Sequence, residues 1–537
     1  MTAFSVASSK PRGVTVSWPW HPVICRGAPS AALALCFLAG GCGSDDGDAS
    51  PVDAGAPADA AAADAGQEGS TVTGTQIDRH AVPNDEVEEP VDLSDAAIEA
   101  LWIDDSESFA SAQGEGRADG TFAVEGVPED EFYLRVDVQP DDDSFAGAFH
   151  VTRERELDLG VIRVGYPDSD FPSEGTTIDF QVTDMEPFEQ FTDRLALVVP
   201  QTGSVARFVE SAITPAIQDG ATALEGEFDL WDGLGVPARF RGDRGDTPVL
   251  LHVQELEDDR RAVTGAATFE LEEDFVHDDG TELELSGAFQ GLELEDTTIE
   301  LLADDIDELA AELTPGDDDL ISMHVLAGAG PIVDEQLPLR GLVPQLPFLA
   351  QAEFEAEDAD VTISHANPFS DDWDEIGTLQ VSASHFYDVE GESVSLSAVA
   401  RHTNELGALS GDPVAPPIPA LSDLEVEGLD ASERVEDVGT TPEISWAAPS
   451  SVPSNDEIFY RVDVHTLRET APDDLSFRLS ATVYTTETDL RIPPGVIADD
   501  DQVAIRVRAM AGAPSDAPHR PATPFSYTER LSALITP

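Results

Sequence analysis

The chain has 537 residues, and 108 acidic residues against 27 basic ones give it a formal net charge of −81 at pH 7. Apolar residues make up 41% of the sequence, which is enough to build folded cores and excludes a wholly disordered chain. A surface this anionic repels phosphate backbones and anionic lipid headgroups, which argues against nucleic-acid binding and polybasic membrane attachment. At roughly 150 residues per domain, the length predicts about three or four domains.

The N-terminus has the pattern of an export signal. Basic residues precede an apolar stretch at 28–41, which is shorter than the roughly 20 residues of a membrane-spanning helix. Small residues then lead into Cys42, and residues 38–42 resemble the lipobox of bacterial lipoproteins, although Leu38 lies one place further from the cysteine than is usual. The resemblance implies removal of residues 1–41, acylation of Cys42 and, because Gly43 follows, passage to the outer membrane. A plain secretory signal or a membrane anchor is the alternative.

Cysteine usage agrees with lipid attachment. The only cysteines are Cys25, Cys36 and Cys42, so cleavage after Gly41 leaves one thiol and no internal disulfide. The membrane, reached through acyl chains on Cys42, is therefore a predicted partner, and a protein or glycan partner stays open. Which face of the outer membrane is exposed stays open.

The charge balance predicts a protein that depends on salt. Lys10, Arg12 and Arg26 precede the cleavage point, so the mature chain keeps 27 − 3 = 24 basic residues and a net charge of 24 − 108 = −84. This surface is similar to those of proteins from saline habitats, where mobile ions screen the repulsion. We expect non-specific cation binding and no cofactor. The acid runs at 141–143, 317–319 and 499–501 lack the spacing of an EF-hand loop and predict solvated turns rather than calcium sites.

Residues 42–70 are mostly Ala, Asp, Gly, Pro and Ser, and they predict a disordered acidic tether. Short strands and turns follow at 71–167. Asp119 and Gly120 predict a turn there, with Phe122 alternating inward and Tyr133 leading an apolar strand.

This run of turns and strands resembles the carboxypeptidase regulatory-like module. The resemblance implies a small transthyretin-like β-sandwich that is accessory and non-catalytic.

Residues 171–402 form a β-rich central region. Apolar residues alternate or cluster there at strand length, and Pro315 and Gly316 end one predicted helix at 304–313. The sequence permits one large sandwich or two small ones. The strands expected in this region lie at 195–199, 223–231, 249–256, 263–271, 282–289 and 394–399. Glycines and a proline at 328–331 predict a turn.

A proline-rich linker is expected at 403–419, followed by a last domain at 420–537. Its apolar segments, at 443–446, 459–464, 490–492 and 503–509, resemble the B, C, E and F strands of a fibronectin type III domain. The resemblance implies a sandwich whose core holds Trp446 and Tyr460. The tyrosine usual at the start of the F strand is absent.

The sequence contains no set of residues that indicates a particular reaction. The chain has no phosphate-binding glycine loop, zinc-protease motif or nucleophile elbow. His365, His385 and His402 lie near one another in sequence, but their spacing fits no zinc site, so we expect isolated strand or loop histidines. Residues 239–246 contain Arg-Gly-Asp twice and resemble an integrin-binding loop; a polar hairpin with local Arg–Asp pairs is the favoured interpretation.

These patterns predict an all-β, multidomain protein of β-sandwiches behind a signal and a tether. The leading hypothesis is a non-enzymatic exported lipoprotein with a surface binding, adhesion or structural role. The alternative is an exported hydrolase, acting on glycan or peptide, with its active site in the central region. No catalytic, cofactor-binding or metal-binding residue is predicted, and Cys42 is the single predicted modification site.

Overall fold

The computed structural model describes residues 69–537, apart from gaps at 83–84, 139–146, 168–176, 203–206, 209–212, 230–238, 258–259, 279, 281, 317–319, 332–345, 356–357, 390, 453–456, 472–473 and 514–521. The predicted signal, Cys42, tether residues 43–68 and the acid runs at 141–143 and 317–319 lie outside the described residues. The fold class is confirmed, since the chain is 59% strand and 5% helix.

The N-terminal module packs its alternating residues around one core. Phe122 and Val124 are buried in that core together with Phe132 and Leu134, as the alternation predicts. Its strands are β1 (Ser70–Thr75), β2 (Ile77–Val82), β3 (Asp85–Pro90), β4 (Ala97–Ile103), β5 (Phe109–Gly116), β6 (Thr121–Val127), β7 (Phe132–Asp137), β8 (Gly147–Thr152), β9 (Glu156–Asp158) and β10 (Ile162–Val164).

The first part of the central region holds a four-stranded sheet, ordered β14-β15-β11-β18, and a hydrogen-bonded series β13-β12-β16-β17. On β18, Leu283 and Leu285 are buried and Glu282 and Glu284 are exposed, as predicted. The elements are β11 (Thr177–Thr183), β12 (Arg194–Val198), η1 (Pro200–Thr202), β13 (Arg207–Phe208), β14 (Ile213–Thr214), β15 (Leu224–Asp229), η2 (Gly242–Arg244), β16 (Val249–Glu255), β17 (Arg261–Thr268) and β18 (Glu282–Ala288).

The second part contains the longest strand and the predicted helix. Helix α1 covers residues 303–312 and buries Ile306, Leu309 and Ala310, the face that the sequence predicts. The elements are β19 (Gln290–Gly291), β20 (Glu295–Glu300), α1 (Ala303–Glu312), β21 (Leu320–Pro331), β22 (Phe348–Phe354), β23 (Asp360–His365), β24 (Trp373–Val389) and β25 (Glu392–Glu405).

The C-terminal module packs two sheets around Trp446 and Tyr460, whose rings lie 5.2 Å apart. The expected B and E strands, β29 and β32, pair with each other, and so do the expected C and F strands, β30 and β33. The short helix α2 (Leu406–Leu409) buries its leucines in the core of the central region. The elements of the C-terminal module are β26 (Ser422–Val426), β27 (Leu429–Asp430), β28 (Val435–Glu436), β29 (Glu443–Ala447), β30 (Glu457–Ala471), β31 (Asp474–Thr485), β32 (Asp489–Arg491), β33 (Val503–Ala513), β34 (Ala522–Leu531) and β35 (Ile535–Thr536).

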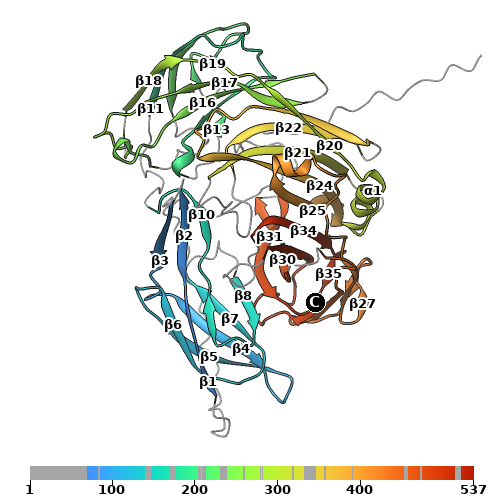
Figure 1. Ribbon diagram of the computed structural model, residues 1–537. Coiled ribbons are helices and arrows are strands. Elements are labelled where there is room, and N and C mark those ends of the chain that lie inside the picture. The colour runs from blue at the N-terminus through green and yellow to red at the C-terminus, as the bar shows by residue number, and fades with distance from the viewer. Residues whose placement is uncertain are drawn as a thin grey trace, which may run out of the picture.

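Hydrogen bonds between strands join all three modules. Antiparallel pairing of β25 with β34 connects the central region to the C-terminal module, with Ala400 opposite Thr528. Parallel pairing of β31 with β8 continues into the N-terminal module, with Tyr484 opposite His150. Figure 1 shows β24, β25 and β34 side by side, and β8 next to β31; β33 lies between β34 and β30.

Two predictions of irregular structure are corrected. The turn expected at 328–331 is the end of strand β21, where a Cβ on Gly330 would lie 2.9 Å from Ile376. Small residues are needed there for close packing rather than for a turn.

The expected linker at 403–419 is also packed into the structure. Val414 exchanges backbone hydrogen bonds with Glu300 and Leu302 (2.8 and 2.9 Å), and Ile418 is fully buried in the C-terminal core. The apolar residues between the prolines gain burial by packing here, and this outweighs the extended preference of the prolines.

Candidate functional site at the junction of the modules

One face of the joined strands carries a line of polar and aromatic side chains, which we name the polar row. Cross-strand register places each residue opposite the next, from β8 through β31, β30, β33 and β34 to β25, β24 and β21, except for Glu529 and Tyr527, which lie two positions apart on one face of β34. The polar row consists of His150, Tyr484, Arg461, Arg508, Glu529, Tyr527, Arg401, Gln380 and His324.

Strict alternation along the strands builds this face. On β30, Val462 and Val464 enter the apolar core, so the intervening Arg461, Asp463 and His465 point to the opposite side of the sheet. Those three residues are nevertheless buried, with exposed fractions of 9%, 1% and 6%. Charges on this face are therefore covered by protein and need partners within it.

Asp463 is the centre of the charge network. Its carboxylate accepts hydrogen bonds from Arg461 Nε (2.7 Å), Arg506 Nη2 (2.9 Å) and Thr482 Oγ1 (2.8 Å). These donors come from β30, β33 and β31, so one carboxylate holds three neighbouring strands in register.

Glu529 performs the same role two strands further along, on β34. Its Oε1 accepts a 2.7 Å hydrogen bond from Arg508 Nε and lies 3.7 Å from Arg506 Nε, while its Oε2 accepts the backbone N–H of Val399 at 2.8 Å. Val399 belongs to β25, so this carboxylate connects the C-terminal module to the central region.

Aromatic rings continue the network at both ends. Tyr527 lies between two guanidinium groups, with its ring centroid 4.5 Å from Arg508 and 5.7 Å from Arg401. Tyr484 stacks on His150 with ring centroids 5.1 Å apart and planes 13° from parallel. The contacts therefore reach from the N-terminal module to β25.

The electrostatics follow from burial and pairing. Burial acts to raise the pKa of Asp463, but Arg461 and Arg506 outweigh it and hold that pKa well below the usual range. Burial, reinforced by the charge of Arg506, lowers the pKa of His465 to about 3. Burial also lowers the pKa of His324 to about 4, with a contribution from Arg401, and that of His402 to about 4. The carboxylate is thus ionised and the histidines are neutral at pH 7.

The three histidines singled out in the sequence have separate surroundings. His365 Nε2 lies 2.9 Å from Thr297 Oγ1, and its Nδ1 lies 3.2 Å from a Glu375 oxygen. His402 Nδ1 lies 2.8 Å from Ser526 Oγ. His385 contacts Tyr387 edge to face, with centroids 4.6 Å apart. In the ranges that the structure covers, no group of three or more His, Cys, Asp or Glu side chains is placed to hold a metal ion.

The double Arg-Gly-Asp segment forms the local ion pairs that the sequence favoured. Arg241 donates to both oxygens of Asp243 (2.9 and 2.6 Å), and Arg244 pairs with Asp246 at 2.9 Å. Asp246 is 2% exposed, and the backbone forms the 3₁₀ turn η2 rather than a hairpin. The buried Asp246 is unsuited to an adhesion loop, whereas Asp243 of the first Arg-Gly-Asp is exposed and paired with Arg241.

The acid run at 499–501 is only partly a solvated turn. Asp499 and Asp500 are exposed, but Asp501 is 4% exposed, pairs with Arg468 and accepts the backbone N–H of Ala498 at 2.9 Å. Its carboxylate therefore stabilises the turn before β33.

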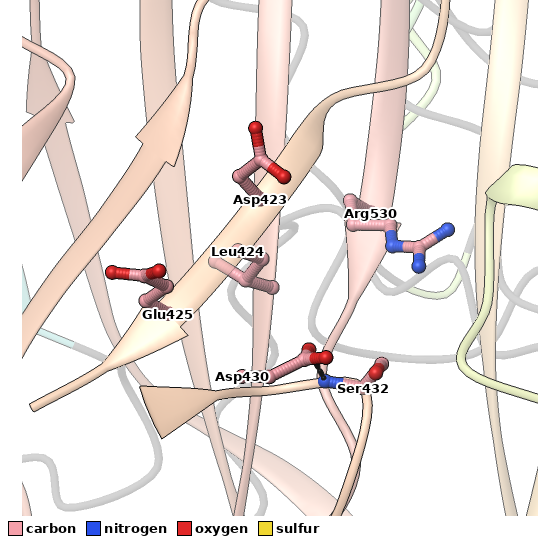
Figure 2. A pocket seen from close by; sticks show the side chains of 6 residues that line it. All are labelled: Asp423, Leu424, Glu425, Asp430, Ser432 and Arg530. Atoms are coloured by element: carbon pink, nitrogen blue, oxygen red, sulfur yellow. Dashed lines mark hydrogen bonds between the residues drawn. The ribbon is translucent and has the colours of Figure 1, made fainter. Parts of the chain in front are cut away.

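A surface hollow of about 300 Å³ lies in the C-terminal module (Figure 2). Its wall carries the carboxylates of Asp423, Glu425 and Asp430, and Asp430 accepts the backbone N–H of Ser432 at 2.9 Å. Arg530 lines the same hollow but donates to the carbonyl of Glu312, at the end of α1. This guanidinium therefore supplies the positive charge that favours a helix C-terminus.

The central region contains one buried carboxylate–imidazole pair among its described residues. His252 Nε2 lies 2.9 Å from Asp193 Oδ2, and the two residues are 1% and 2% exposed. Gln254 Nε2 donates to the same carboxylate oxygen at 3.2 Å. These polar contacts hold the end of the β11–β12 loop against β16. Because both residues of the pair are buried, water does not reach them.

The polar row was not predicted from the sequence. The signal was present as charges alternating with valines on β30 and β33, which indicates two faces. Alternation alone assigns such charges to solvent, because it contains no information about what covers the second face.

No protein family matches the chain, and no curated protein matches it. The chain is similar to a tetra-tandem repeat in the extending region of a large adhesion protein, with 12% identity over 86% of this chain and 99% of that one and a TM-score of 0.11. It is also similar to Sidekick-1 immunoglobulin domains 1–4, with 9% identity over 88% and 95% and a TM-score of 0.11. Such low TM-scores carry no argument about function.

Within the described part of the chain, no helix has the length and apolarity needed to cross a membrane.

Proposed function

We propose that the chain is a non-enzymatic, exported lipoprotein that displays one stiff β-sheet body for binding or adhesion. The observation that supports this most directly is the polar row, because it links strands of three modules that would otherwise move as separate domains. A tether ahead of such a body presents its loops at a distance from the membrane. The carboxypeptidase regulatory-like and fibronectin type III-like assignments belong to the same proposal.

Stiffness is tested by pulling single molecules of the full chain from both ends. We expect the three modules to unfold in one cooperative event, since strand pairing and the polar row cross their boundaries. Three separate force peaks, each of one module's contour length, would contradict the proposal.

Anchoring is tested by mass spectrometry of the chain produced in a Gram-negative host. The expected product begins at Cys42 and carries acyl chains, whereas Cys42→Ser yields no lipidated species and leaves the membrane fraction. An intact N-terminus on the wild-type protein would refute the anchor.

A further inference from the structure

The loop between β11 and β12 presents a single aromatic side chain to solvent. Phe191 is 84% exposed, while Met185 and Phe188 of the same loop are each 3% exposed in the core below it. Its backbone has φ = 86°, a left-handed conformation that is an outlier for a bulky residue. An exposed ring held in a strained backbone conformation does not stabilise the fold of the free chain.

Hydrogen bonds on both sides hold this conformation. The backbone N–H of Glu189 donates to Asp193 Oδ2 at 2.9 Å, and the N–H of Asp193 donates back to the Glu189 carbonyl at 3.0 Å. The N–H of Gln190 donates to Asp219 Oδ1 at 3.2 Å. Asp193 is itself bound by buried His252, so the turn carrying Phe191 is anchored in the core.

The surroundings of the ring are acidic. Glu186, Glu189 and Asp219 are all exposed on the loop or on the segment hydrogen-bonded to it. Arg194, the first residue of β12, donates to the carbonyl of Asp193 at 3.1 Å. A second copy of this chain, with net charge −81, would be repelled.

We propose that Phe191 is the anchor of a protein-binding surface whose partner offers an apolar pocket ringed by basic side chains. Buried aromatic anchors dominate the affinity of protein interfaces, and complementary charge around them speeds and selects encounter. The inference deepens the binding role proposed above and rests on it.

The test uses a probe with this chemistry, β-cyclodextrin carrying amino groups on its rim, in calorimetric titrations of the full chain. We expect Phe191→Ala to weaken binding of the amino-cyclodextrin at least ~10-fold. Phe386→Ala, which removes a ring that is 44% exposed on β24, is the matched control and should leave affinity unchanged. Glu186→Gln combined with Glu189→Gln should weaken binding of the amino probe but not of unmodified β-cyclodextrin.

A second variant distinguishes a role of the Phe191 ring in binding from a role in the stability of the fold. Phe191→Gly suits the left-handed backbone, so it should keep or raise the melting temperature while binding is lost. Equal affinity of wild type and Phe191→Ala, or a melting temperature lowered by Phe191→Gly as for a core residue, would overturn the inference. Failure here, with cooperative unfolding and lipidation intact, would leave the proposed display function standing.

Discussion

Replacing Asp463 by asparagine tests whether the buried charge network beside the polar row holds the modules together. The substitution keeps the shape of the side chain and an oxygen acceptor, but it removes the negative charge between Arg461 and Arg506. Both guanidinium groups would then remain buried, and the Glu529 carboxylate, 3.7 Å from Arg506, would be left to compensate them.

The expected cost follows from burial. Removing one partner of a buried ion pair costs roughly 3–5 kcal/mol, because the other charge is left without compensation. The amide introduced by Asp463→Asn would still accept a hydrogen bond, and Glu529 still faces Arg506, so we expect the lower end of that range, about 3 kcal/mol of unfolding free energy. Removing a guanidinium as well, in Asp463→Asn with Arg506→Gln, should recover about 1 kcal/mol or more.

The assay is urea unfolding followed by tryptophan fluorescence, to which Trp446, 4% exposed in the C-terminal core, contributes. Asp499→Asn, an exposed aspartate of the same module, is the control and should change the free energy of unfolding by less than about 0.5 kcal/mol. If Asp463→Asn costs no more than this control, the network does not stabilise the junction and the reasoning is wrong.

Three other perturbations have definite signs. Burial lowers the pKa of His324 and His402 to about 4 from an unfolded value of about 6.5, so the folded state is most stable with respect to these groups above pH 6.5 and loses stability as the pH falls towards 4. The melting temperature should therefore fall as the pH is lowered over this range, and the double variant His324→Gln with His402→Gln should show a smaller fall. The melting temperature should fall on dialysis from about 1 M to 10 mM salt, as the Debye length grows from roughly 3 to 30 Å, and an unchanged value would contradict the role assigned to surface repulsion. Gly160→Ala should destabilise strongly, since its Cβ would lie 1.8 Å from the Ile77 carbonyl oxygen, whereas Gly407→Ala meets nothing within 4 Å and should be tolerated; thermal melts that do not separate the two variants would count against the packing described at Gly160.

Particular elements show which features of the fold can be predicted from local sequence periodicity. The alternation at residues 282–285 predicted the buried leucines and exposed glutamates of β18, and the 3.6-residue spacing predicted the buried face of α1. The lipidation at Cys42, the family resemblances and the domain boundaries stay predictions.

Other segments could not be assigned from local pattern. β24 is buried on both faces over residues 376–384, so it lacks a clean alternation, and the glycines of β21 look like a turn although close packing explains Gly330. In the expected linker, the frequent prolines indicate an extended linker, but residues between them form contacts with segments more than a hundred positions away. Val414, for example, donates a backbone hydrogen bond to Glu300.

By itself the sequence determined the charge, the export pattern and the β-rich class, because each depends on composition or on neighbours a few residues apart. The tertiary structure alone decided that β25 pairs with β34 and β31 with β8, and that Arg461, Asp463 and Glu529 are buried rather than solvated. Strand pairing and the burial of a sheet's second face depend on contacts between residues far apart in the chain. Local periodicity contains no information about these contacts.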